Sequence, residues 1–331
     1  MFTRILVPLD GSAFASRAVP YAVFLARALN GSLTLFHASP DRARAGRDAA
    51  DEDTIDEQQR IAEQLVRAGV PTSVRAATGD TGPAIVQAIS ALGVDLVVMA
   101  THDRGGVGRL VQGNVADFLL HHVQVPILAV SPACSRVWEH GRPLRVLIPL
   151  DGSAASEAAI TPVLELARWL SVEVLLLRAV EDRFEIDAIG FARSEPASRT
   201  DLDAARKELE PIAAPLRAAG YVVAVSAEAG KPDDVIGMVA SRDAIDLVAM
   251  ATRGQGGLGQ LLVDGMATVV TAGRVPLHLG SVATASIRQV TVPVLLVSPV
   301  SDAHAGEPAG SPTITAAPPG TGPGDEQLGR T

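Results

Sequence analysis

The chain of 331 residues carries one ordered set of segments twice, and this repetition restricts its fold more than any other feature. Three runs recur in the same order: RILVPLDGS at 4–12 returns as RVLIPLDGS at 145–153, VDLVVMAT at 94–101 as IDLVAMAT at 245–252, and VPILAVSP at 125–132 as VPVLLVSP at 292–299. The separation between the copies grows from 141 to 151 to 167 residues, so the second copy carries insertions of ten and sixteen residues. The sequence therefore predicts two copies of one domain.

Within each copy, strand-like and helix-like segments alternate. In the first copy the expected strands are short runs rich in Val, Ile and Leu, near 4–9, 32–38, 70–76, 94–100 and 125–131. Helical stretches lie between them, near 13–30, 53–68, 83–92 and 113–122. Apolar runs without strict alternation indicate strands buried on both faces. Because alternating strands and helices favour a parallel sheet with right-handed crossovers, we expect an α/β fold of two tandem doubly wound, Rossmann-like domains.

Several residues mark expected helix ends and irregularities. Asp53 or Thr54 is expected to cap the second helix, and Gly69 stands where a C-terminal glycine belongs. Pro20 and Pro162 fall inside the first helix of each copy and are expected to kink it.

Composition narrows the function classes. The net charge is −9, and no basic run is interleaved with aromatic residues, which argues against a nucleic-acid partner. No apolar stretch approaches the roughly 18 residues that span a bilayer. The single cysteine, Cys134, cannot form an internal disulfide, and no Cys/His cluster has the spacing of a metal site. We expect a cytoplasmic protein without a membrane partner.

The repeat and the composition also set the expected domain boundaries. The first domain covers 1–132, a short linker 133–143 follows, and the second domain covers 144–300. The sixteen-residue insertion is placed at about 263–278. Residues 301–331 are rich in Pro, Gly, Thr and Ala without apolar periodicity, so we expect a disordered tail.

Two landmarks follow strands in each copy: an Asp-Gly-Ser turn after the first strand and a glycine-rich loop after the fourth. In doubly wound sheets, ligands bind beyond the carboxyl ends of strands where the strand order reverses. Glycines let backbone N–H groups approach phosphate oxygens, and the following helix N-terminus favours anions. Asp10 and Asp151 are suited to accept hydrogen bonds from ribose hydroxyls. The same Asp-Gly-Ser sequence is also ordinary turn chemistry, so both residues have a capping interpretation.

Taken together, the VPLDGS strand end, the Ala-Thr-His loop, and GSVA before VPVLLV resemble the universal stress protein family. The resemblance covers both copies up to about Pro299. It implies five-stranded parallel sheets of the adenine nucleotide alpha hydrolase-like type, with ATP, alone or with Mg2+, between the first and fourth strands. It further implies pairing of fifth strands, either in a homodimer or within one chain as a pseudo-dimer.

In ATP-binding members of that family the loop reads Gly-x2-Gly-x9-Gly-(Ser/Thr). The first copy keeps the spacing, but Asp103 replaces the second glycine and Asn114 the hydroxyl residue. A carboxylate facing a triphosphate is repulsive, although Arg104 and Arg109 stand nearby to offset its charge.

The second copy keeps the glycine at Gly254. Two alignments end its loop: Gly280-Ser281, which we prefer because the fifth strand follows at the right distance, and Asp264-Gly265. On the preferred alignment the insertion lies within the phosphate loop. The run GQGGLG at 254–259 also satisfies a dinucleotide fingerprint, but it follows the fourth strand rather than the first and so matches weakly.

The resemblance implies two nucleotide-contacting sets. In the first copy they are Pro8, Asp10, Ala38, Met99, Ala100, His102, Asp103, Gly113, Asn114 and Val115. In the second copy they are Pro149, Asp151, Ala179, Met250, Ala251, Arg253, Gly254, Gly280, Ser281 and Val282. His102 also has an interpretation as a solvated loop residue, since Arg253 replaces it.

These observations lead to three functional hypotheses. The first is an ATP- or adenine-nucleotide-binding stress protein that acts as a sensor or regulatory module. The second is a nucleotide-independent stress protein that serves as a dimerisation or partner scaffold. The third is a slow nucleotide hydrolase or phosphoryl-transfer protein. We disfavour it because the sequence shows no positioned base, no P-loop lysine pattern and no two-metal carboxylate set. We therefore expect a protein that is not an enzyme and has no catalytic residues.

Overall fold

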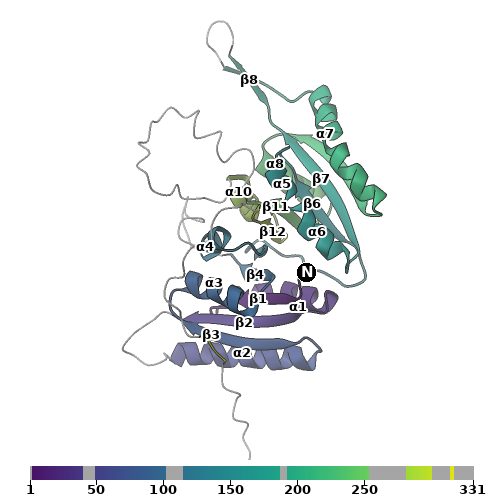
Figure 1. Cartoon of the computed structure of the whole chain (residues 1–331). Helices are drawn as coiled ribbons and strands as arrows, with labels where there is room; N and C mark the ends of the chain where they lie inside the picture. Colours follow the sequence, from purple (N-terminus) through teal and green to yellow (C-terminus); the bar gives the residue numbers. More distant parts are fainter. Residues whose placement is uncertain are drawn as a thin grey trace, which may run out of the picture.

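The computed structural model in Figure 1 describes residues 2–39, 49–101, 115–186, 192–252, 281–299 and 314–316. Its first half contains the expected alternation of strands and helices. The strands are β1 (Arg4–Pro8), β2 (Ser32–Ser39), β3 (Thr72–Thr78), β4 (Leu96–Ala100) and β5 (Ile127–Val130). The helices are the 3-10 helix η1 (Ala15–Ala18) and the α-helices α1 (Val19–Ala28), α2 (Ala49–Arg67), α3 (Thr81–Leu92) and α4 (Val115–His122).

The second half repeats this order. Its matching strands are β6 (Leu144–Pro149), β7 (Val172–Val180), β10 (Val222–Ala229), β11 (Leu247–Ala251) and β12 (Val294–Val297). Its helices are α5 (Ala154–Glu157), α6 (Ile160–Ala167), α7 (Arg199–Ala218), α8 (Pro232–Arg242) and α10 (Ser281–Gln289). The repeat read from the sequence is therefore confirmed as a structural repeat.

An additional hairpin in the second half accounts for the ten-residue insertion. β8 (Arg183–Ile186) and β9 (Ala192–Glu195) pair antiparallel in a separate two-stranded sheet between β7 and α7. The hairpin extends away from the second half in Figure 1. The sixteen-residue insertion at about 263–278 lies outside the described residues.

Each half forms a five-stranded parallel sheet, and the two sheets join into one. The strand orders are β3-β2-β1-β4-β5 and β10-β7-β6-β11-β12. The fifth strands of the two halves pair antiparallel, with Leu295 opposite Leu128, so that the sheet is continuous through the middle of the molecule. The pairing of fifth strands therefore occurs within one chain.

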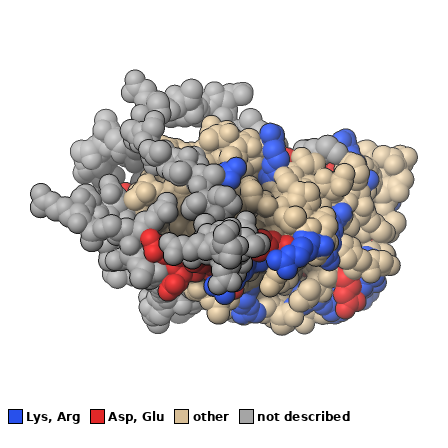
Figure 2. Space-filling model, turned by 90° about the horizontal axis from the view of Figure 1, so that it is seen from below, with Lys and Arg blue, Asp and Glu red and all other residues tan. Residues whose placement is uncertain are grey.

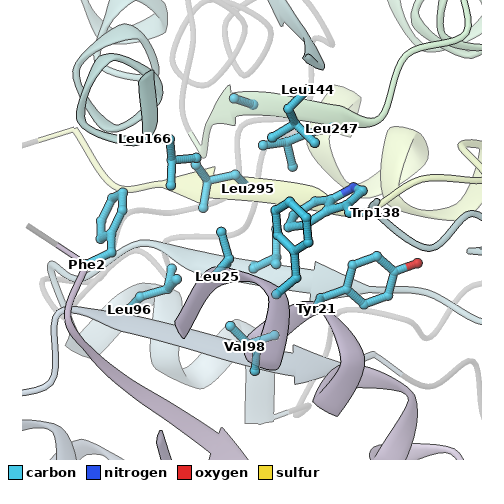
Figure 3. Close-up of a cluster of buried hydrophobic side chains, with 14 of the residues drawn as sticks. Phe2, Tyr21, Leu25, Leu96, Val98, Trp138, Leu144, Leu166, Leu247 and Leu295 are labelled. Carbon is cyan, nitrogen blue, oxygen red and sulfur yellow. The ribbon is translucent and has the colours of Figure 1, made fainter. Parts of the chain in front are cut away.

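The core forms two layers, one on each face of this sheet, and both layers cross from one half to the other. One layer combines residues such as Leu25 and Leu96 of the first half with Leu247 and Leu295 of the second. Figure 3 shows these side chains in one cluster, with Trp138 of the linker at one side of it. The other layer joins Ile127 and its neighbours to residues of β11, β12 and α8. The two halves thus share their apolar interior, which is built mainly from aliphatic side chains.

The structure corrects three local expectations. Pro20 and Pro162 do not kink a helix, because each lies in the first turn of a new helix, α1 or α6, after a short separate one. A proline in a first turn removes no hydrogen bond from the helix. Asp53 and Thr54 do not cap α2, since the helix begins at Ala49 and both lie inside it. Gly69 does follow the end of α2, with a φ of 83°.

The expected disorder of the tail is corrected at one point. Ile314–Ala316 form the short strand β13, which pairs antiparallel with the outer edge of β3. The rest of 300–331 lies outside the described residues.

No helix among the described residues has the length and hydropathy of a membrane span. The face drawn in Figure 2 carries basic and acidic side chains interspersed among uncharged residues.

Candidate functional site

The strand order places one candidate crevice in each half. From β1 the chain moves outward through β2 and β3, then returns to the other side of β1 for β4 and β5. In the second half the same reversal occurs between β6 and β11. The neighbouring strands are in register, with Leu6 beside Val97 and Leu147 beside Val248. In such sheets the point where the strand order reverses is the usual ligand position, so each half has one candidate crevice at the carboxyl ends of these strands.

The Asp-Gly-Ser turn of the first half forms one wall of its crevice. Gly11 has a φ of 80°, a region that favours glycine, and a Cβ there would lie 2.6 Å from Thr54 Oγ1. The N–H of Ser12 donates to Asp10 Oδ1 at 3.0 Å, and the Ser12 hydroxyl accepts from the N–H of Ala15 at 3.0 Å. The turn is thus bonded both to its own carboxylate and to the start of η1.

The second half repeats this turn with more hydrogen bonds. Gly152 has a φ of 82°, and Asp151 Oδ1 accepts from both the N–H and the hydroxyl of Ser153, at 2.9 and 2.6 Å. Ser153 Oγ in turn caps α5 by accepting from the N–H of Ser156 at 3.1 Å. The turn-capping interpretation of Asp10 and Asp151 therefore describes a real role. The same hydrogen bonds also fix the orientation of each carboxylate at the rim of the crevice.

Beneath each turn, a polar side chain from the second strand supports the backbone. His37 is buried, and its Nδ1 lies 3.0 Å from the carbonyl oxygen of Leu9 while its Nε2 lies 3.3 Å from Asp51 Oδ1. Gln58 Nε2 donates to the same Leu9 carbonyl at 3.3 Å.

In the second half Arg178 takes the place of His37. Its Nη1 donates to the Leu150 carbonyl at 3.3 Å and lies 2.9 Å from the position of a Cβ at Gly152. Sequence reasoning missed both residues. The available signal was their spacing, since each stands 27 residues after the aspartate of its turn in both copies.

The opposite wall of each crevice comes from the end of the fourth strand. Met99 and Met250 are buried, and the alanines that follow them, Ala100 and Ala251, are half-buried strand ends. Thr101 is the next residue after Ala100; it is buried, and its hydroxyl has no hydrogen-bond partner among the described residues.

Other predicted residues border the same edge. They are the strand-end residues Pro8 and Pro149, the half-buried Ala38 and Ala179 of β2 and β7, and Val115 and Val282 in the first turns of α4 and α10. The structure therefore brings these described residues to the carboxyl edge of each half.

The glycine-rich loops themselves lie outside the described residues. This applies to His102, Asp103, Gly113, Asn114, Arg253, Gly254 and Gly280. α10 begins at Ser281, the position that the preferred alignment gives to the hydroxyl residue, whereas the rival pair Asp264-Gly265 is not described. Within the described part of the chain, no group of three or more His, Cys, Asp or Glu side chains is arranged to hold a metal ion.

Comparison with known proteins gives a consistent result for both halves. The model of the universal stress protein family matches residues 1–131 and 144–298. A universal stress protein of Mycobacterium tuberculosis strain H37Rv is 28% identical over 296 residues, which cover 82% of this chain and 94% of that protein. A relative from Mycolicibacterium smegmatis is 24% identical over 204 residues, 62% of each chain. The crystal structure of a universal stress protein from Archaeoglobus fulgidus has a TM-score of 0.60 at 18% identity, covering 91% of this chain and 99% of that one.

Proposed function

Because the chain belongs to the universal stress protein family in both halves, we propose that it binds adenine nucleotide, ATP above all, and acts in the stress response as a regulatory module. The observation that carries this proposal is the duplicated arrangement at the carboxyl edges of β1 and β4 and of β6 and β11. Each edge combines an aspartate turn with the end of the fourth strand and the start of the helix that precedes the fifth strand.

Each part of this arrangement has a role suited to a nucleotide. The aspartates offer acceptors for ribose hydroxyls, and the N-termini of α4 and α10 offer unpaired N–H groups and a positive dipole end for phosphates. The buried Thr101 hydroxyl adds a donor at the end of β4 in the first half.

We propose that the second half holds the stronger site. Its loop keeps Gly254 and ends at Gly280-Ser281, whereas the first loop carries Asp103 and Asn114 at matching positions. A glycine amide next to a phosphate is favourable, whereas a carboxylate there is repulsive.

We propose binding rather than turnover. The loops lack the lysine pattern of phosphoryl-transfer enzymes. Mg2+ would enter with the triphosphate rather than through a preformed protein cage, as is usual for that ion.

Calorimetric titration of the full chain with MgATP tests the proposal. We expect at least one site, and Asp151→Asn should weaken it about tenfold, since a hydrogen bond to a charged acceptor contributes roughly 1.5–3 kcal/mol. Asparagine still accepts the turn hydrogen bonds, so the fold should survive. Asp203→Asn on the exposed face of α7 is the matched control and should leave the affinity unchanged. Absence of heat with folded wild-type protein would contradict nucleotide binding.

A nucleotide-independent scaffold is the second candidate, favoured by the departures at Asp103 and Asn114. On that hypothesis the wild-type chain gives no heat with MgATP, and the double substitution Asp103→Gly/Asn114→Ser creates binding. ATP released from denatured, freshly purified wild-type protein and detected by mass spectrometry would exclude this candidate.

A further inference from the structure

The linker between the two halves is held by the helices that follow the first Asp-Gly-Ser turn. Arg17 of η1 donates to the carbonyls of Pro132 and Cys134, at 3.0 and 2.5 Å. The buried Tyr21 donates its hydroxyl to the carbonyl of Arg136 at 2.5 Å. The hydroxyl of Ser12 in the turn accepts from the N–H of Ala15, the first residue of the same η1. The turn and the linker are therefore attached to one short helical segment.

The other side of the linker is held by the beginning of β11. Asp246 is fully buried, and its Oδ1 accepts from Arg142 at 2.6 Å and from Arg136 at 3.3 Å. Its Oδ2 accepts from the backbone N–H of Arg145 at 3.0 Å. Trp138 donates its indole N–H to the Asp246 carbonyl at 2.9 Å.

Aromatic packing connects these two sets of hydrogen bonds. The Trp138 ring is in edge contact with Tyr21 and with Phe24, at centroid distances of 5.1 and 5.4 Å. Figure 3 shows Trp138 between Tyr21 of α1 and Leu247 of β11. A contiguous path therefore runs from the first-half turn to the first residues of β11. It is exposed at Arg17 and buried at Tyr21, Trp138 and Asp246.

Among the residues that the structure describes, the second-half turn has no equivalent of this path. The residues that match Arg17 and Tyr21 in the repeat are Ala158 and Pro162, which cannot donate such side-chain hydrogen bonds. Asp95, the counterpart of Asp246, accepts only from residues 3 and 4 in the hydrogen bonds of the described chain. The connection is thus specific to one of the two crevices.

We propose that the linker is a mechanical coupling that transmits displacement of the Asp10-Gly11-Ser12 turn to the start of β11 in the second half. Coupling between sites travels through packed side chains and hydrogen bonds of this kind. The coupling itself does not depend on a ligand. Its consequence, that occupancy of the first crevice alters the second half, rests on the proposed nucleotide binding.

The chain contains its own probes for this coupling. Cys134 is the only cysteine of the sequence, its side chain is buried, and burial raises the pKa of its thiol. The thiol of Cys134 should therefore react slowly with a thiol reagent while the linker contacts are intact. Hydrogen exchange of a peptide covering 244–248 reports the second-half end of the path. The Arg145 carbonyl accepts the Asp246 N–H there at 2.8 Å.

The experiment compares two matched glycine substitutions in the full chain. Gly11→Ala and Gly152→Ala both add a Cβ at a positive φ, where it collides with Thr54 or with Arg178. We expect Gly11→Ala to speed both the reaction of Cys134 and the hydrogen exchange at 244–248. Both rates should rise about fivefold, because a change of that size corresponds to the loss of roughly one hydrogen bond. Gly152→Ala should change neither rate.

Arg17→Met gives a second route that leaves the turn glycine in place. By itself, Arg17→Met should speed both the reaction of Cys134 and the exchange at 244–248. Adding Gly11→Ala should then have little further effect, because the hydrogen bonds from Arg17 to the linker are already lost. The proposal is overturned if Arg17→Met and Gly11→Ala act independently, or if either exposes Cys134 while exchange at 244–248 keeps its wild-type rate. MgATP binding without any change in either rate would overturn only the ligand consequence.

Discussion

At the scale of single residues, Asp246 differs from its repeat counterpart Asp95 in burial and in hydrogen-bond partners. Asp246 is fully buried between two arginine side chains, whereas Asp95 is half-buried and bonds to nearby backbone and a hydroxyl. Removing a buried partner from a charge network is among the most destabilising single changes. Arg136 and Arg142 are about 40% exposed, so they can be hydrated when the carboxylate is lost.

Asp246→Ala should therefore lower the free energy of unfolding by about 2 kcal/mol, below the roughly 3–5 kcal/mol seen when the remaining charge stays buried. Asp95→Ala should cost about 1 kcal/mol, as expected for partly exposed hydrogen bonds. Urea unfolding followed by circular dichroism measures both values. Equal losses would contradict the role assigned to the linker arginines.

Tyr21 gives a prediction on pH. Burial, with a contribution from nearby Cys134, raises the pKa of Tyr21 to about 12 from an ordinary 10. The folded state therefore holds this proton more tightly than the unfolded state, so its contribution to stability is complete below pH 10 and decreases as the pH rises towards 12.

The chain has two tyrosines, so the difference in absorbance titration between wild type and Tyr21→Phe isolates this group. We expect a midpoint near pH 12 in the folded protein and the ordinary midpoint in urea. The wild type should also lose more stability than Tyr21→Phe between pH 10 and 12. A midpoint near 10 in folded protein would contradict the burial of the hydroxyl.

The sequence identified the rim of the candidate site but not its support. Asp10 and Asp151 could be found because a short turn motif recurs beside strand ends. His37 and Arg178 could not, because their importance comes from contact with a carbonyl 28 residues earlier along the chain. Only the folded sheet brings these groups together.

At the scale of elements, the strands and helices of each half followed from apolar runs and their alternation. The misplaced features are helix starts, before Pro20 and Pro162 and at Ala49 of α2. The elements that were not expected are short: the hairpin β8–β9 and β13. Periodicity does not reveal such elements, since three or four residues carry too little pattern. β13 also depends on a distant edge, which no local sequence signal specifies.

β13 covers the outer edge of β3, and open strand edges are sites of association between chains. A chain that ends at residue 300 should therefore self-associate more strongly than the full chain. A chain that ends at 316 keeps β13 and is the matched control. Sedimentation velocity at several concentrations measures the effect, and identical behaviour of the two truncations would argue against edge protection by β13.

At the scale of the whole molecule, the two halves share one sheet and two continuous core layers. Domains with separate cores unfold in separate steps, whereas a shared core favours one cooperative transition. We expect a single urea transition, with circular dichroism and the fluorescence of the buried Trp138 coinciding once Trp169 is replaced by Phe. Two resolved transitions would show that the halves are independent.

The antiparallel pairing of β5 with β12 also determines what lies between the two crevices. β4, β5, β12 and β11 stand side by side there in one hydrogen-bonded sheet. An influence that passes through the sheet from one crevice to the other would cross these four strands.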